Sequence, residues 1–206
     1  MKVAGIHYRS IWQSADDGVV EIIDQTKLPH VFETKRLETM EDAAHAIRAM
    51  LVRGAPLIGA TAAYGLALAL RVNASDAALE EARAKLLATR PTAVNLRWAL
   101  DDVVHTVRPL PVEARAAAAF ARAAEICDED ARTNKRIGEH ALALFEKAYA
   151  AKQGDGPLNV LTHCNAGWLA TVDWGTALAP MFLAHDKGLP IHVWVDETRP
   201  RNQGAG

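Results

Sequence analysis

The stretch that most constrains the fold is LNVLTHCNAGWLATVDWG, at residues 158–175. Residues 159–162 are apolar and rich in β-formers, as in a short buried strand. A polar turn follows at 163–167, and helical spacing resumes over 176–185. A strand that ends in a polar turn and feeds a helix is typical of open parallel α/β sheets, which gather reactive groups at the carboxyl ends of their strands.

Cys164 occupies that strand-end position. A thiol beside the backbone N–H groups of a helix start has a lowered pKa and can serve as base or nucleophile. A small buried cysteine that only packs fits the same pattern, so the residue alone leaves both readings open. His163 should point to the opposite face of the strand, which predicts a packed or backbone-bonded histidine rather than a Cys–His pair.

Upstream, residues 1–153 have the pattern of a helical domain (38–153) preceded by a small β element (1–37). A Thr-x-x-Asp capping box at Thr39 opens the helical part, and its longest helical pattern covers 112–152. The expected strands are 6–12, 19–23 and 30–34, and the expected helices begin near 39, 57, 76, 91 and 112.

The linker QGDGP at 153–157 separates this part from the opening of a parallel α/β domain at 158–206. That second part offers one strand–helix unit and one further strand at 191–195. Two parallel strands cannot bury their faces and edges. We therefore expect an incomplete domain whose sheet continues in a longer chain, in preference to a sheet completed by a partner.

Bulk composition excludes several classes of function. A net charge of −2 and a pI near 6.4 give no electrostatic footprint for nucleic acid or an anionic membrane. Cys127 and Cys164 have no metal-type spacing, and two cysteines predict a reducing compartment without disulfides. The N-terminus lacks a signal-peptide core, and the apolar run 58–70 is shorter than a membrane span. A soluble, cytoplasmic protein is expected.

Two arginines stand just before helix starts. In RGAP at 53–56, Arg53 precedes Gly54 and Ala55, and the following proline suits a first helical turn, so a guanidinium would lie beside free N–H groups. Arg90 begins a similar run, RPTAVNL, at 90–96. Together they could bind one anionic ligand such as a phosphate, whereas taken alone each is better explained as an ordinary helix corner.

Further polar residues follow the strand at 191–195. Asp196 would be a general acid or base, or more simply the ion-pair partner of Arg199. Gln203 lies beyond them and could donate to sugar hydroxyls. No GxGxxG or Walker-type glycine motif is present, so no dinucleotide or nucleoside triphosphate is indicated.

Taken in order, four blocks resemble the signature segments of the methylthioribose-1-phosphate isomerases of methionine salvage. That family has a small N-terminal domain followed by a Rossmann-like domain, in agreement with the pattern above. The blocks are RGAPLIG at 53–59, RPTAVNL at 90–96, THCNAG at 162–167 and DETRPR at 196–201.

The resemblance implies an aldose–ketose isomerisation of 5-methylthioribose 1-phosphate, without a metal or organic cofactor. It makes Cys164 the catalytic thiol. The family's catalytic aspartate comes from a later segment, so Asp173 and Asp196 are not given its role. A homodimer is expected from the resemblance and because the apolar helix 57–70 would need cover. The implied substrate-binding residues are Arg53, Gly54, Ala55, Arg90 and Gln203.

Two other functions fit the same superfamily. A ribose-1,5-bisphosphate isomerase would need an additional cationic group where the first enzyme needs an apolar pocket for its methylthio group. A non-catalytic regulatory subunit of the exchange factor for translation initiation would need neither the thiol nor two anion sites. The intact blocks around Arg90 and Cys164 favour an isomerase.

Overall fold

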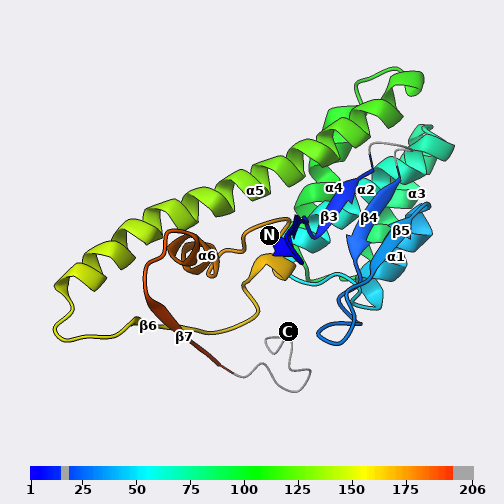
Figure 1. Ribbon diagram of the computed structural model, residues 1–206. Coiled ribbons are helices and arrows are strands. Elements are labelled where there is room, and N and C mark those ends of the chain that lie inside the picture. Colours follow the sequence, from blue (N-terminus) through cyan, green and yellow to red (C-terminus); the bar gives the residue numbers. More distant parts are fainter. Residues whose placement is uncertain (15–18, 197–206) are drawn as a thin grey trace.

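A computed structural model describes residues 1–14 and 19–196. The chain is a mixed α/β protein organised along the helix α5 (Val112–Ala151). One half of α5 packs against the other helices and a small sheet, and its other half packs against the C-terminal part of the chain (Figure 1). The remaining helices are α1 (Met40–Arg48), α2 (Ala55–Val72), α3 (Asp76–Leu87), α4 (Val94–Val107), the 3-10 turn η1 (Trp168–Ala170) and α6 (Ala179–Asp186).

Helix starts follow the capping residues in the sequence. Thr39 accepts a hydrogen bond from the Asp42 N–H while the Asp42 carboxylate accepts from the Thr39 N–H, so the expected capping box opens α1. Ser75 caps α3 by accepting from the Ala78 N–H. The helix expected from residue 91 starts later, at Val94, because the chain turns once more around Pro91 before it becomes helical.

The N-terminal β element differs from the expected one in its bounds. The first expected strand is split in two, because Ile6–His7 pair with Lys2–Val3 in a separate hairpin, whereas Ile11–Gln13 pair with the strand at residues 20–23. The third strand begins at Thr34 instead of residue 30, since its pairing with the strand at residues 20–23 begins where Thr34 lies opposite Ile23. The strands are β1 (Lys2–Val3), β2 (Ile6–His7), β3 (Ile11–Gln13), β4 (Val20–Ile23) and β5 (Thr34–Leu37), and β3, β4 and β5 form one antiparallel sheet.

The C-terminal part is a parallel βαβ unit. Strands β6 (Leu158–Thr162) and β7 (Ile191–Val195) pair in parallel, and α6 lies in the connection between them. Gly138 of α5 lets α6 come close, since a Cβ there would lie 2.9 Å from the Cβ of Ala179. The parallel pairing confirms the α/β fold class, while the domain division at 153–158 stays a prediction.

The apolar helix α2 is the centre of the core, where the sequence had suggested an exposed surface. α1, α3, α4 and α5 all pack on it, and its residues 57–68 are buried without a break. The argument that this helix needs cover from a second subunit is therefore wrong. α2 is long and apolar enough to span a membrane by length and composition, yet 72% of it is buried inside the fold, as in a core helix.

We expect Leu66→Ala in α2 to lower the free energy of unfolding by about 2–5 kcal/mol, because the side chain is fully buried and the cavity would be closed in by four helices. Leu144→Ala is the control, since Leu144 on α5 is 67% exposed and should cost no more than about 0.5 kcal/mol. Urea denaturation of both variants measures the difference. Equal losses would contradict a core centred on α2.

Candidate functional site

The turn after β6 presents Cys164 to solvent. Cys164 has φ of 71°, a left-handed conformation that non-glycine residues rarely adopt, and its side chain is exposed. The second cysteine, Cys127, is 2% exposed in α5, as expected of a core residue. Burial raises the pKa of the Cys127 thiol to about 12, which leaves it protonated and unreactive at neutral pH.

A pocket of about 220 Å³ opens beside this turn. Cys164 and Asn165 form part of its wall, and Trp168, Leu178 and Phe182 make another part apolar. The Ala177 N–H donates to the carbonyl of Ala166 at 3.0 Å, which holds the approach to α6 against the turn. The expected arrangement of strand, polar turn and helix start is thus present, with η1 inserted between the turn and the helix.

The N-terminus of α2 lies against η1. Gly54 precedes the helix with φ of 90°, and a Cβ at that position would lie 2.3 Å from the carbonyl oxygen of Ala170. Ala55 and Pro56 form the first helical turn, and no described side chain caps it. First-turn N–H groups without a side-chain cap are suited to binding an anion.

Arg53 stands at this helix start as the sequence predicted. Burial lowers the pKa of its guanidinium, although the group remains charged at any physiological pH. Its Nε donates to Oε1 of Gln25 at 2.8 Å, and Nε2 of Gln25 donates to the carbonyl of Leu169 at 2.7 Å. The chain of contacts Arg53–Gln25–Leu169 therefore joins the start of α2 to the segment that follows the cysteine turn.

Arg90 is exposed, in the turn before α4. The start of α4 lies beside α2, since a Cβ on Gly59 would be 3.0 Å from the backbone oxygen of Asn95. This packing brings the two arginine-bearing helix starts to neighbouring places in the fold. A shared ligand between Arg53 and Arg90 stays a prediction, and Gln203 lies outside the described residues.

His163 and Asp196 form a contact that corrects the expectation of a packed histidine. Nδ1 of His163 lies 3.0 Å from Oδ2 of Asp196, at the ends of β6 and β7. His163 is exposed rather than packed, because the left-handed turn at Cys164 lifts the chain out of the strand. Asp196 pairs with this histidine, and Arg199, its expected partner, lies outside the described residues.

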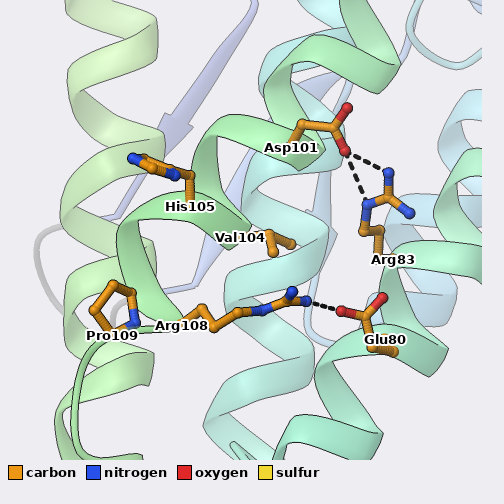
Figure 2. Close-up of a pocket in the computed structure, with 7 residues that line it drawn as sticks. All are labelled: Glu80, Arg83, Asp101, Val104, His105, Arg108 and Pro109. Atoms are coloured by element: carbon orange, nitrogen blue, oxygen red, sulfur yellow. Dashed lines mark hydrogen bonds and ion pairs between the residues drawn. The ribbon is translucent and has the colours of Figure 1, made fainter.

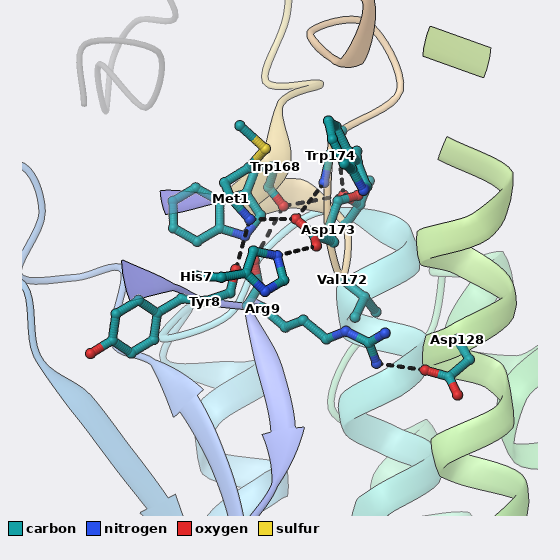
Figure 3. A network of polar contacts seen from close by, with 12 residues as sticks. Met1, His7, Tyr8, Arg9, Asp128, Trp168, Val172, Asp173 and Trp174 are labelled. Atoms are coloured by element: carbon teal, nitrogen blue, oxygen red, sulfur yellow. Dashed lines mark hydrogen bonds and ion pairs between the residues drawn. The ribbon is translucent and has the colours of Figure 1, made fainter. Parts of the chain in front are cut away.

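After the cysteine turn, the segment at residues 168–175 takes part in a polar network that the sequence analysis did not predict (Figure 3). The carboxylate of Asp173 is 3% exposed and lies 2.6 Å from the Met1 α-amino group and 2.8 Å from Nε2 of His7. The Val172 N–H donates to Asp130 on α5 at 2.7 Å, and the Ser10 N–H donates to the Val172 carbonyl at 2.9 Å. These contacts tie the cysteine segment to the N-terminal strands and to α5.

A second hollow, of about 480 Å³, lies between α3 and α4 (Figure 2). Its charged groups are paired across the helices, Arg83 with Asp101 and Arg108 with Glu80. None of the predicted site residues lines it. Among residues 1–14 and 19–196, no cluster of three or more His, Cys, Asp or Glu side chains is arranged to hold a metal ion.

The described part of the chain is a mixed α/β fold with an exposed thiol at the end of a parallel strand, and an arginine-bearing helix start contacts the segment that follows this thiol. Residues 51–206 match the model of the initiation factor 2 subunit family, and the chain belongs to this family. The methylthioribose-1-phosphate isomerase of Paramagnetospirillum magneticum is 62% identical over 205 residues, which cover 100% of this chain and 56% of that protein. The chain thus spans a little over half the length of the curated relatives it matches.

Two solved structures are similar over nearly the whole chain. The 5-methylthioribose 1-phosphate isomerase of Pyrococcus horikoshii has a TM-score of 0.83 at 36% identity, and the match covers 97% of this chain and 55% of that one. Subunit delta of the translation initiation factor eIF-2B from A. fulgidus has a TM-score of 0.82 at 38% identity, covering 97% and 57%. The family resemblance of the four sequence blocks is confirmed.

We expect Gly54→Ala to cost several times more free energy of unfolding than Gly154→Ala. Both glycines have positive φ, which costs an alanine about 1 kcal/mol, but a Cβ on Gly154 meets nothing within 4 Å, whereas a Cβ on Gly54 collides with Ala170. Urea denaturation of the two variants measures the difference. Similar costs would show that the contact between α2 and η1 is loose.

Asp130→Asn should change the pH dependence of stability. Burial raises the pKa of the Asp130 carboxyl above its ordinary 3.8, so the folded chain binds that proton more tightly than the unfolded chain. Its stabilising contribution is full below pH 3.8 and is lost as the pH rises through the folded pKa. The asparagine keeps an acceptor for the Val172 N–H, so its stability relative to wild type should rise over that range in urea titrations. A difference independent of pH would contradict this.

Proposed function

We propose that the protein of which this chain forms the matched part is an aldose–ketose isomerase that converts 5-methylthioribose 1-phosphate into 5-methylthioribulose 1-phosphate. The observation that carries the proposal is the exposed Cys164 in a pocket whose wall includes Leu169, the residue that Gln25 joins to Arg53 at the start of α2. The relatives in three bacteria that are at least 60% identical to the chain bear the name of this activity, which supports the same conclusion.

The reaction needs proton transfers and no net oxidation. The bond between C1 and the ring oxygen breaks and that oxygen gains a proton; one hydrogen moves from C2 to C1, and the C2 hydroxyl loses its proton as the carbonyl forms. The phosphate stays on C1 throughout. A thiol at the pocket wall can act as the acid–base group for one of these steps, and Cys164 takes this role.

The phosphate binds where the chain supplies positive charge and N–H groups. Arg53 offers a guanidinium, and the first turn of α2 at Gly54 and Ala55 offers backbone donors at the positive end of the helix dipole. Arg90, exposed in the turn before α4, is the proposed second cation, and Gln203 is the proposed partner of the sugar hydroxyls.

The pocket lining favours a methylthio group over a second phosphate. Trp168, Leu169, Leu178 and Phe182 contribute apolar surface, and none of the described lining residues carries a positive charge. A ribose 1,5-bisphosphate would place a dianion there without a counter-charge from residues 1–14 and 19–196, which is unfavourable in an apolar pocket. The proposed substrate is therefore the methylthio sugar. A cytoplasmic location and a homodimer are part of the proposal on the family resemblance alone.

The test is an isomerase assay with 5-methylthioribose 1-phosphate on the reading frame continued to its own stop codon, beside the chain as printed. Cys164→Ala should reduce kcat by about a thousandfold or more, because it removes the acid–base group. Cys127→Ala is the matched control, since it removes the buried thiol and should leave kcat within about twofold.

Ribose 1,5-bisphosphate is the comparison substrate and should react at least about a hundredfold more slowly. A folded, longer protein that is inert toward both sugars would overturn the proposal. It would favour the alternative of a non-catalytic subunit, and the A. fulgidus protein is named as a translation initiation factor subunit.

A further inference from the structure

Gln25, directly after β4, is a polar side chain buried between the two halves of the candidate site. It is 4% exposed, and both ends of its carboxamide are used. Oε1 accepts from Nε of Arg53 at 2.8 Å, and Nε2 donates to the carbonyl of Leu169 at 2.7 Å. Leu169 lines the pocket that contains Cys164, so one buried amide touches both the phosphate-binding arginine and the pocket wall.

The two partners fix the direction of this amide. A guanidinium can only donate and a backbone carbonyl can only accept, so the group between them must accept at one end and donate at the other. An ionised glutamate would face the Leu169 carbonyl with a second acceptor and would neutralise Arg53. A neutral carboxamide orients the guanidinium without adding a negative charge beside it.

The backbone around Gln25 is held in place independently of its side chain. The Gln25 N–H donates to the carbonyl of Leu51 at 3.0 Å, two residues before Arg53, and the Asp24 N–H donates to Glu33 at 2.9 Å. The close contact of Gly54 with Ala170 adds a second link between the same two segments. The start of α2 and the cysteine segment are thus joined at two adjacent points, of which Gln25 is the polar one.

We propose that Gln25 is a positioning residue for the isomerisation: it fixes the Arg53 guanidinium and the Leu169 side of the pocket relative to each other, so that the bound phosphate and the Cys164 thiol meet the same sugar in one geometry. This inference rests on the proposed function for its kinetic consequence, although the coupling between Gln25 and the cysteine segment can be measured without it.

The experiment compares three variants of the full-length gene product. Gln25→Met has a similar length and removes both hydrogen bonds. Gln25→Glu removes the donor to Leu169 while ionised, but its protonated acid can again both accept and donate as the amide does. Thr26→Val is the matched control, because it removes a neighbouring hydroxyl that bonds only to Asp24 in the described contacts.

Two readouts are taken well below the melting temperature of each variant. The first is kcat and KM for 5-methylthioribose 1-phosphate between pH 5 and pH 8. The second is the rate at which iodoacetamide alkylates Cys164, followed by peptide mass spectrometry, with the buried Cys127 as an internal reference. The second readout does not depend on turnover.

Gln25→Met should lower kcat/KM about tenfold or more at every pH, with a raised KM, and should speed Cys164 alkylation about threefold because the segment loses an anchor. At pH 8, Gln25→Glu should have a kcat/KM as low as that of Gln25→Met. As the pH falls, its kcat/KM relative to wild type should rise. Thr26→Val should match wild type in both readouts. A merely structural role would lower the melting temperature without this pH-dependent recovery.

The proposal is overturned if Gln25→Met keeps kcat/KM and the alkylation rate within about twofold of wild type. If the wild-type protein shows no isomerase activity, the proposed function fails and the alkylation rates still decide the present inference. Unchanged alkylation in both Gln25 variants would then refute the coupling, and a faster rate in Gln25→Met but not in Thr26→Val would support it.

Discussion

The close backbone contact between Gly54 and Ala170 is the constraint on which the candidate site depends. It brings the start of α2, with its arginine and its uncapped N–H groups, against the segment that follows the cysteine turn. A side chain at residue 54 would push these two parts of the chain away from each other. The burial of α2 by four neighbouring helices then gives this contact a rigid base.

A second constraint lies in the segment that follows the cysteine turn, residues 168–175, which makes several buried polar contacts. Asp173 binds groups from the first strands, and Asp130 holds the Val172 N–H from α5 (Figure 3). Buried carboxylates are costly unless they are paired, so this segment has few alternative conformations once the N-terminal strands have docked. The turn with Cys164 is thus followed by a segment with a well-defined conformation, although the thiol itself is exposed to solvent.

Local signals in the sequence predicted the helices more accurately than the strands. The capping residues Thr39 and Ser75 set the starts of α1 and α3, and the long Ala-rich pattern gave α5 within a residue or two. The predicted start of the third strand, at residue 30, was wrong. β5 begins at Thr34, because that is where its pairing with β4 begins. The expected exposure of α2 was wrong, because α1, α3, α4 and α5 pack on it. Hydropathy alone does not show which neighbours cover a helix.

By itself, the sequence determined the chemical groups of the site: the thiol of Cys164, the arginine at each of two helix starts, and the glycine that permits a close approach. Tertiary structure alone decided which of these groups meet. Gln25 lies in the short polar run at residues 24–27, which matches no catalytic motif considered in the sequence, and only the fold places its amide between Arg53 and Leu169. The physical reason is that residue type fixes what a group can donate or accept, whereas the partners of a buried amide come from segments far apart in the chain.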